Sequence, residues 1–394
     1  RNAFLFGIVY ATGSLSCTLP IFLVVVGSSL ASQGLANSFV QFIGYGLGMG
    51  TNALFSTHDR FGAGFDDNLG AAYPGAVYFA TRTITNDVST ISSDVEEINV
   101  QLGAGDDTFV VDSVSPIGVT NVLGGGGDDT LTASSTATGL HPNSTTRVDF
   151  VDGALILDGQ GGTNTIVLDD SGDDDINTGT YLGTTVSGMD MTGSATFANA
   201  ANVEVRLGAQ DDVFYVPAVA ADVTTTLLTG GGFDTVYVGT TEGNETTGSL
   251  DAILGDFVVE GQGPTAKDAL YFNDQDNAAS SNYLFTNAVT GTRTLANGDP
   301  WPVDTSTFNR TGTGNILYRT METVVLNAGA GDDTIDVQGT HREQDVSGGK
   351  ASSLAFNAGA GADTVQLGQP LAGGGRSLDN FSIDIGTPTF DSVK

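Results

Sequence analysis

Residues 124–131 read Gly-Gly-Gly-Gly-Asp-Asp-Thr-Leu, a glycine-rich turn with two acids that leads directly into an apolar residue. The same order of glycine, spacer, glycine, acid and apolar residue returns along the chain. The copies occupy residues 102–109, 124–131, 207–214, 230–236, 329–335 and 359–365. Six copies of one pattern indicate a repeat protein, and the apolar residue after each turn predicts the start of a short strand whose side chain points inward.

The glycines and acids of this repeat suit a hard cation. A glycine adopts positive φ angles easily, so the turn can direct backbone carbonyls toward one point while the aspartates add negative charge there. Calcium prefers such a shell of oxygens. The candidate aspartate ligands are Asp106, Asp107, Asp128, Asp129, Asp211, Asp212, Asp234, Asp332, Asp333 and Asp363. The glycines that would provide carbonyl ligands or permit the turn are Gly103, Gly105, Gly125, Gly127, Gly329 and Gly331.

Residues 124–132 fit every position of a known nonapeptide: glycine, glycine, any, glycine, any, aspartate, any, large apolar, any. The repeat therefore resembles the haemolysin-type calcium-binding (RTX) family, and the resemblance implies bound Ca²⁺. The other copies lack the first glycine, and Gln210 replaces the second loop glycine of the third copy.

The acidic turns are spaced more widely than back-to-back nonapeptides. The intervals are 22 residues from Asp107 to Asp129, 22 from Asp212 to Asp234, and 30 from Asp333 to Asp363. One coil of a β-solenoid would fill such an interval, which places successive acidic turns above one another on one edge. A cation would then bridge Asp106 and Asp107 to Asp128 and Asp129, because stacked bare carboxylates repel each other.

The composition restricts the partners of the chain. Its 394 residues contain 13 Lys and Arg against 46 Asp and Glu, a formal charge of −33. Such a charge argues against nucleic acid and anionic membrane surfaces and makes cations the natural partners. An acidic, lysine-poor surface is also typical of salt-adapted organisms, and that interpretation stays open beside calcium.

Residues 1–50 differ from the rest because they are nearly uncharged and apolar, and 3–30 is long enough to span a bilayer as a helix. The residues around Cys17, together with 7–11 and 44–50, resemble part of a DsbD-like or cytochrome c biogenesis transmembrane protein, in which Cys17 would match one redox cysteine. Cys17 is the single cysteine of the chain. Three interpretations remain open: an anchor or export signal, a remnant of an unrelated reading frame, and a redox helix.

The fold expected from residue 75 onward is all-β, a parallel β-solenoid (β-helix or β-roll-like) of tandem repeats. Short strands are bounded by Gly, Asp, Asn or Thr, and no period of 3.6 residues stands out after residue 50. Residues 164–172 also resemble 268–274, which suggests long units with related starts. The expected segments are 1–50 (apolar and helical), 51–74 (linker), 75–162, 163–264 and 265–394 (solenoid units 1 to 3).

Signals for catalysis are few. The histidines His58, His141 and His341 stand alone, and no zinc or phosphate-loop motif occurs. The alternative is a polysaccharide lyase or hydrolase, since β-helices can carry carboxylates and an arginine in a groove. The candidate catalytic groups are Arg206 near Glu204 and Arg319 near Glu322. The competing interpretation is that these residues form ion pairs between neighbouring strands.

Two further groups of residues have an interpretation as sites and a plainer one. Aromatic residues could line a sugar groove, although inward stacking is favoured; they are Trp301, Tyr271, Phe272 and Tyr283. The densest acid cluster could bind another cation, although a hydrated loop is favoured; it comprises Asp169, Asp170, Asp173, Asp174 and Asp175.

The sequence as a whole predicts a calcium-binding β-solenoid with a structural or adhesive role, and not an enzyme. The expected location is the outside or the surface of a bacterium, with or without a membrane anchor in residues 1–50. Expected partners are calcium ions, glycans, other surface proteins or further copies of the chain. Calcium binding outside the cell would add its free energy to folding, so that folding depends on the ion.

Overall fold

The computed structural model describes residues 77–79, 97–135, 146–261, 267–294, 300–340, 353–372 and 374–377. The helix expected in 1–50 and the linker expected at 51–74 lie outside these residues. The contacts of the chain divide it into two units, Arg1–Gly62 and Ala63–Lys394, and every described residue belongs to the second. A search of the described residues for a helix long and apolar enough to cross a membrane finds none.

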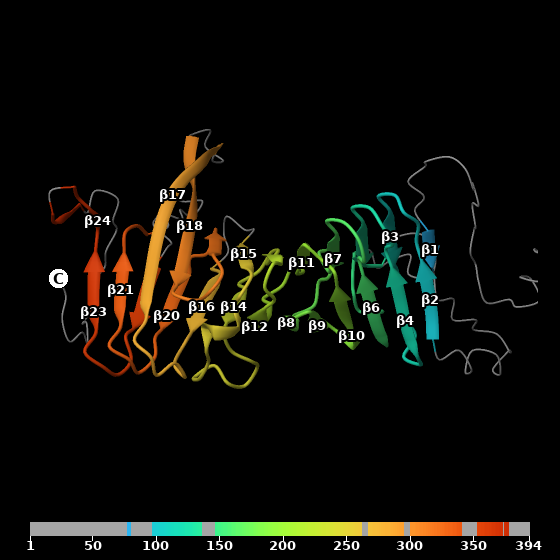
Figure 1. Cartoon of the computed structure of the whole chain (residues 1–394), viewed down its shortest axis with the longest axis horizontal. Coiled ribbons are helices and arrows are strands. Elements are labelled where there is room, and N and C mark those ends of the chain that lie inside the picture. Colours follow the sequence, from blue (N-terminus) through green and yellow to red (C-terminus); the bar gives the residue numbers. More distant parts are fainter. Residues whose placement is uncertain are drawn as a thin grey trace, which may run out of the picture. The chain divides into compact units, whose positions relative to one another are not determined.

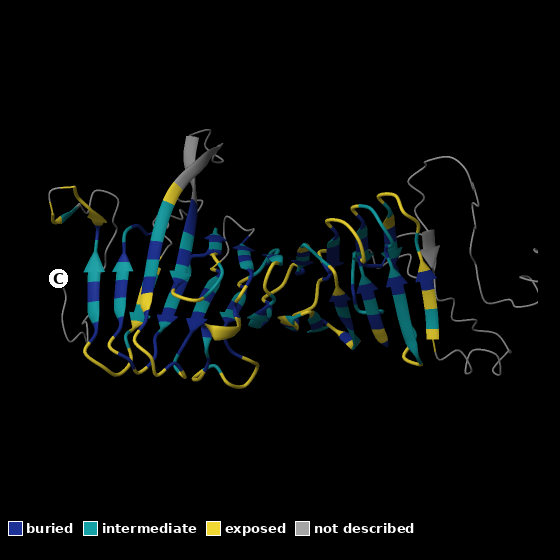
Figure 2. Ribbon diagram, viewed as in Figure 1, coloured by how far each residue is buried: buried dark blue, intermediate teal, exposed yellow. Residues whose placement is uncertain are grey.

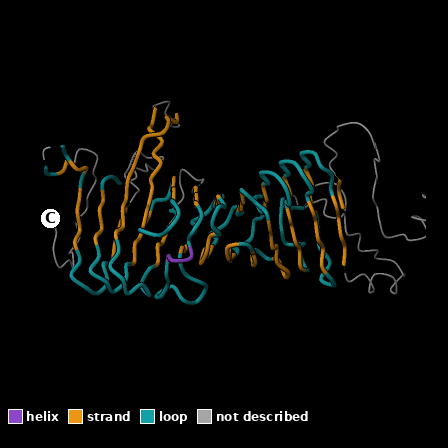
Figure 3. Tube along the Cα trace, in the orientation of Figure 1, coloured by secondary structure: helices purple, strands orange, loops and turns teal. Residues whose placement is uncertain are grey.

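The described chain is all-β, with one short 3₁₀ turn, η1 (Leu250–Ala252), shown in purple in Figure 3. Its strands form two large, mostly parallel sheets and one small pair (Figure 1). Sheet A contains, in spatial order, β1 (Val77–Phe79), β3 (Thr108–Val111), β5 (Thr130–Ala133), β7 (Thr165–Asp169), β11 (Asn202–Arg206), β13 (Thr224–Leu228), β15 (Asp256–Glu260), β19 (Ile316–Arg319), β18 (Pro300–Arg310), β17 (Asn282–Thr294), β21 (Thr334–Val337) and β23 (Thr364–Leu367).

Sheet B is assembled in the same way from the intervening strands. It contains β2 (Glu97–Gln101), β4 (Val119–Leu123), β6 (Ala154–Asp158), β10 (Met191–Ala198), β9 (Thr185–Gly188), β8 (Thr178–Gly183), β12 (Val213–Val219), β14 (Thr235–Val238), β16 (Ala269–Asn273), β20 (Thr323–Asn327) and β22 (Ser353–Asn357). The small pair consists of β24 (Gln369–Pro370) and β25 (Arg376–Ser377).

Alternation of the side chains explains why these segments are strands. In β13 every second residue is buried, and the remaining positions carry threonine or leucine, which suit a pleated, half-buried surface. Figure 2 shows the same alternation along most strands. Because the pairing is parallel and in register, Phe109 lies beside Leu131, which lies beside Ile166, which lies beside Val203. Like residues therefore stack in rows.

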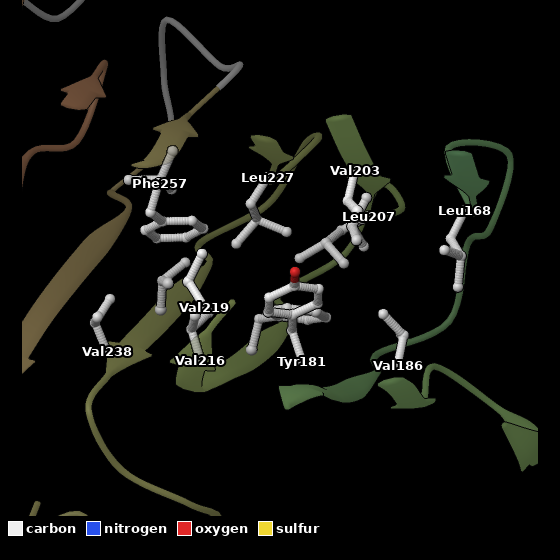
Figure 4. Close-up of a cluster of buried hydrophobic side chains, with 14 of the residues drawn as sticks. Leu168, Tyr181, Val186, Val203, Leu207, Val216, Val219, Leu227, Val238 and Phe257 are labelled. Atoms are coloured by element: carbon white, nitrogen blue, oxygen red, sulfur yellow. The ribbon is translucent and has the colours of Figure 1, made fainter. Parts of the chain in front are cut away.

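The apolar core lies between the two sheets (Figure 4). Leu168, Leu227 and Phe257 of sheet A face Tyr181 and Val216 of sheet B. All five side chains are at most 1% exposed. Burial of such side chains is the main favourable term for this fold, because it removes apolar surface from water.

The chain passes from one sheet to the other after nearly every strand, which makes the arrangement solenoid-like. One turn of the chain through both sheets is called a coil here. Glu97 pairs with Val119 in sheet B, and Thr108 pairs with Thr130 in sheet A, so both strands of this coil advance by the same 22 residues. The prediction of an all-β chain built from parallel strands is confirmed by these two sheets.

Two antiparallel meanders interrupt the alternation. Strands β8, β9 and β10 all lie in sheet B, and β17, β18 and β19 all lie in sheet A. Counting each meander as a single strand, the chain makes seven crossings from β2 to β11 and seven more from β11 to β20. Seven is odd, so the strands that precede the acidic turns change sheet from one pair of turns to the next. They lie in sheet B for the first pair, in sheet A for the second and in sheet B for the third.

This result corrects the expectation that all acidic turns share one edge. The turns after β2 and β4 lead from sheet B to sheet A, and those after β20 and β22 do the same. The turns after β11 and β13 lead from sheet A to sheet B, and so they lie on the opposite edge. Both sheets continue without a break past the expected unit borders at 162 and 264.

Candidate functional site

The two acids of each Asp-Asp turn form hydrogen bonds in opposite directions. Between the first two turns, Asp106 Oδ1 accepts the amide N–H of Asp128 in the following coil at 2.8 Å. Asp129 Oδ1 accepts the amide N–H of Asp107 in the preceding coil at 2.9 Å. The junction between these stacked acidic turns is therefore closed by two reciprocal hydrogen bonds, each donated by a backbone N–H and accepted by a carboxylate.

The same pair of bonds closes the other two predicted junctions. Asp211 accepts from Phe233 at 2.8 Å, while Asp234 accepts from Asp212 at 2.9 Å. In the last junction Asp332 and Asp363 do the same, each at 2.9 Å, with the amides of Ala362 and Asp333 as donors. The structure thus brings each predicted pair of neighbouring turns together, and keeps the three pairs apart.

The second acids belong to longer rows, which we name ladders, in which each backbone N–H donates to the side chain of the next member at 2.8–3.0 Å. Ladder 1 is Asp107, Asp129 and Asn164; ladder 2 is Asn177, Asp212, Asp234, Asp268 and Glu322; ladder 3 is Ser281, Asp333 and Asp363. Sequence reasoning missed five members because they lie outside the glycine pattern: Asn164, Asn177, Asp268, Ser281 and Glu322. The resemblance of 164–172 to 268–274 is the sequence signal from which Asn164 and Asp268 could have been found.

The turn glycines serve the stacking of the coils. Gly103 O accepts the N–H of Gly126 at 3.1 Å, Gly125 O accepts that of Gly161 at 2.9 Å, and Gly329 O accepts that of Ala360 at 3.2 Å. Carbonyls expected as cation ligands therefore already accept a hydrogen bond from the next turn.

The same glycines allow a close approach of the backbones. Gly127 has a φ of 116°, and a Cβ there would lie 2.5 Å from the carbonyl of Gly105. A Cβ at Gly331 would lie 2.4 Å from the amide nitrogen of Ser280. A side chain at either position would collide with the neighbouring coil, so the pattern needs glycine whether or not a cation binds.

Burial separates the two acids of each turn. The first acid is exposed at Asp106, Asp128, Asp211 and Asp332. The second acid is only 1% exposed at Asp129, Asp212, Asp234 and Asp333. The solvated carboxylates are therefore the first acids, whereas these four second acids are taken out of water by the coils on either side; Asp107, in the first turn, is half-buried.

Burial raises the pKa of several ladder carboxyls because it disfavours the charged form. The pKa of Asp212 rises to about 6, that of Asp234 to about 7 and that of Asp268 to about 6. Burial also raises the pKa of Asp333, with Asp363 adding repulsion. The amide bonds to these carboxyls oppose the shift without cancelling it.

Some buried oxygens of the ladders lack a full set of partners. Oδ2 of Asp129 and Oδ2 of Asp333 are buried without a hydrogen bond. The Thr229 hydroxyl lies beside both Asp234 and Asp268, and its single proton can serve only one of them. Among the described residues no arginine or lysine forms an ion pair with Asp129, Asp234 or Asp268. These carboxyls offer oxygen and negative charge, as a calcium site requires.

The arginines considered for catalysis are engaged in ion pairs. Arg206 lies 2.8 Å from Asp169 and 2.5 Å from Glu204. Arg319 lies 3.6 Å from Glu260, its in-register neighbour on β15. Both arginines thus form the cross-strand pairs expected of a strand surface. The three histidines fall outside the described residues.

The aromatic candidates divide between the core and the outer face. Phe272 and Tyr283 are fully buried in the core, as the inward interpretation expects. Tyr271 is half-buried on the outer face of sheet B and stacks on Tyr237 with ring centroids 4.8 Å apart. Tyr237 in turn stacks on Tyr215 at 5.2 Å. The side chain of Trp301 is not among those described.

Comparison with protein-family models, with curated proteins and with solved structures finds no match for this chain. The features of the described chain that bear on function are the ladders, the exposed first acids and the sheets that position them.

Proposed function

We propose that this chain is part of a calcium-stabilised β-solenoid with a structural or adhesive role outside a bacterial cell or on its surface. The observation that supports the proposal best is the set of three ladders, in which buried carboxylates connect successive coils. The most regular motif of the chain joins neighbouring coils to one another, and stacking of coils is how an extended scaffold is built.

Calcium fits this site through charge and through oxygen chemistry. Asp129, Asp333 and the pair Asp234 and Asp268 present buried oxygens with incomplete hydrogen bonding, and the exposed first acids add negative charge beside them. These are the residues that would hold the ion, and the resemblance of 124–132 to the RTX nonapeptide agrees with that choice. A bound cation would favour the ionised form of carboxyls that burial otherwise disfavours.

The proposed ion makes folding depend on its surroundings. Where calcium is scarce, the charged turns repel and the buried carboxyls oppose the stacking of coils. Where calcium is abundant, the free energy of binding adds to the free energy of folding. Such a chain would remain loosely folded before export and would become rigid outside the cell.

The test is a thermal melt of the 394-residue chain followed by far-ultraviolet circular dichroism. Calcium is titrated against a chelator, with magnesium as the control cation. We expect calcium to raise the melting temperature and magnesium to do so much less, since magnesium binds fewer protein oxygens. An identical melt in calcium and in chelator would reject calcium stabilisation and leave the ladders as hydrogen-bonded turns alone.

The polysaccharide-active alternative is not proposed, because no described group favours it. Its arginines are held by neighbouring carboxylates on the strand surface. Incubating the chain with acidic and neutral glycans and searching for new reducing ends would decide the matter, and a cleavage product would return that alternative to first place.

A further inference from the structure

A second group of acids lies where β7 passes to β8, beside the turn that carries Asp211 and Asp212, since the amide N–H of Ala209 donates to the Asp173 carbonyl at 3.0 Å. Asp149, Asp170 and Asp173 each place one carboxylate oxygen within 4.8 Å of the others. Asp170 and Asp173 are 1% exposed, so these two are not part of the hydrated loop that the sequence favours for residues 169–175. Asp174 and Asp175 are exposed, and the expectation fits them alone.

Three side-chain oxygens in this group are buried without a hydrogen bond. Asp170 Oδ1 accepts the amide N–H of Val148 at 2.9 Å, whereas Asp170 Oδ2 has no partner. Asp149 Oδ1 and Asn177 Oδ1 are likewise buried without a hydrogen-bond partner. The Asn177 side chain is oriented toward the group, because its Nδ2 donates to Asp173 Oδ2. Buried oxygens of this kind are costly unless a positive charge or a donor meets them.

Arg147 does not provide that charge to Asp170. Its guanidinium lies 2.5 Å from Asp173 Oδ1, contacts Asp174, and lies 3.6 Å from Asp149 Oδ2. Its remaining contact is to Asp175 at 4.0 Å. Asp170 therefore shares a low-dielectric site with two further acids and no cation of its own among the described residues.

The surroundings make this deficit of positive charge larger. Burial and the nearby acids Asp173, Asp149 and Asp212 together raise the pKa of Asp170 to about 8, against the opposing bond from the Val148 amide. The pKa of Asp149 is raised by burial and by Asp173, with Asp190 adding to the effect. The charged groups around the site are thus almost all negative.

An equivalent turn later in the chain shows what is missing. Asp274 follows β16 as Asp170 follows β7, and its Oδ1 accepts the amide N–H of Leu250 at 2.9 Å. In both turns the third residue donates its N–H back to the aspartate carbonyl, from Asp173 at 2.9 Å and from Asn277 at 3.0 Å. The backbone arrangement is the same in the two turns.

The second carboxylate oxygen, Oδ2, has different partners in Asp274 and in Asp170. Asp274 Oδ2 forms an ion pair with Arg310 Nε at 2.9 Å and accepts the hydroxyl of Tyr283 at 2.7 Å. It also accepts the amide of Asn277 at 3.1 Å. Asp170 Oδ2 has none of these partners. In the later turn a protein cation balances the carboxylate, and in the earlier turn that place has no cation from the described chain.

We propose that Asp149, Asp170, Asp173 and the side-chain carbonyl of Asn177 bind one divalent hard cation, with calcium as the best match. Ligands that share a calcium ion at 2.3–2.6 Å lie at most about 5 Å apart, and the three carboxylates meet that limit. The ion takes the role that Arg310 has beside Asp274. The site adjoins ladder 2 through the Asn177 amide, which donates to Asp212, but none of its carboxylates belongs to an Asp-Asp turn, and it goes beyond the proposed function.

The test counts calcium ions on the folded 394-residue chain by equilibrium dialysis with radioactive calcium. Asp170→Asn keeps the acceptor for the Val148 amide and removes the charge, so we expect it to fold and to bind one calcium fewer per chain. The matched control is Asp274→Asn, whose carboxylate is already paired with Arg310. It should bind as many ions as the unaltered chain.

A second variant protects the test against a folding defect. Asp149→Asn alters a side chain that is 24% exposed, and it should also lose one calcium. An unchanged count in both Asp170→Asn and Asp149→Asn would overturn the site. This result can be told apart from failure of the proposed function, because the loss of one ion in Asp170→Asn supports this site even if the Asp-Asp turns bind none.

Discussion

At the scale of single residues, the two aspartates of one turn are chemically alike in sequence and different in the fold. The first acid points to the next coil and stays in water, whereas the second points to the previous coil and is buried. The difference arises from stacking alone, because each acid meets whichever amide lies within reach in the coil beside it. The buried acid is therefore the residue at which substitution should have the larger effect.

Asp234 tests this difference. Asp234→Asn keeps the acceptor for the Asp212 amide and removes a carboxyl whose pKa is raised to about 7 by burial. We expect a higher melting temperature than that of the unaltered chain at pH 8 in chelator. In ladder 1 the side-chain carbonyl of Asn164 accepts the N–H of Asp129 in the same way, so an amide is tolerated at a ladder position.

The companion variant Asp234→Ala leaves the Asp212 amide buried without its acceptor. A buried donor without a partner costs about 1–3 kcal/mol, so we expect a lower melting temperature than for Asp234→Asn. Asp211→Asn, at the exposed first acid, is the control and should change little. If Asp234→Asn melts below the unaltered chain under these conditions, the buried carboxylate stabilises the fold by itself.

Two glycines of neighbouring turns form a matched pair. Gly125 has a φ of 100°, and a Cβ there would lie 1.8 Å from Gly103 O, whereas a Cβ at Gly105 meets no atom within 4 Å. Gly125→Ala should destabilise the chain by more than about 1 kcal/mol, and Gly105→Ala by less than about 0.5 kcal/mol. Urea unfolding measures both, and equal losses would show that the coils do not stack as described.

At the scale of the element, the unit of stability is the ladder and not the single turn. Ladder 2 combines two acidic turns with residues from two expected units, and its members Asp212 and Asp268 both raise the pKa of Asp234. Ladder 3 is different in its surroundings, because Arg310 lowers the pKa of Asp333 and partly opposes burial. Ladder 2 should therefore respond most to pH and to cations.

In chelator we expect stability to fall as pH rises from about 5 to 8. The folded chain holds protons on Asp212, Asp268 and Asp234 up to pKa values of about 6, 6 and 7, and on Asp170 up to about 8. The unfolded chain releases them near the ordinary value of 3.8. The folded state binds more protons across this window, so raising the pH favours unfolding.

Melting curves at several pH values measure this effect, and saturating calcium should flatten it because a bound cation lowers the same pKa values. Asp234→Asn should flatten part of it in chelator. Stability that rises between pH 5 and 8 in chelator would mean that the ladder carboxyls are ionised and stabilising without any cation.

At the scale of the whole molecule, the register of the coils predicts which deletion the chain tolerates. Removing residues 108–129 joins Asp107 to Thr130, a junction of the same kind as Asp107 to Thr108, and takes out one coil from both sheets. Strand β5 then takes the place of β3. We expect a cooperative melt at a somewhat lower temperature, since stability in such arrays is roughly additive over repeats.

The control deletion removes residues 108–118, which is half a coil. It sends the following strands to the opposite sheets, so their buried and exposed faces no longer match their neighbours. We expect loss of the cooperative melt, measured by circular dichroism and limited proteolysis. Comparable folding of the two deletions would contradict the 22-residue coil.

The sequence alone determined that the chain is all-β, that its acidic turns recur, and that turns separated by 22 or 30 residues are neighbours. These properties depend on local chemistry: alternating side chains, glycine at tight turns and a constant spacing. The same reasoning found the pairs 107 with 129, 212 with 234 and 333 with 363.

The tertiary structure decided what spacing cannot show. The meanders β8–β10 and β17–β19 stay in one sheet, which makes the number of crossings per unit odd and sends alternate turns to opposite edges. It also decided which acid of each turn is buried, and that Asp170 lacks the arginine that Asp274 has. These features depend on which coil lies beside which. Residues far apart in the sequence, such as Asp251 and Arg310 at a separation of 59 positions, meet only after folding.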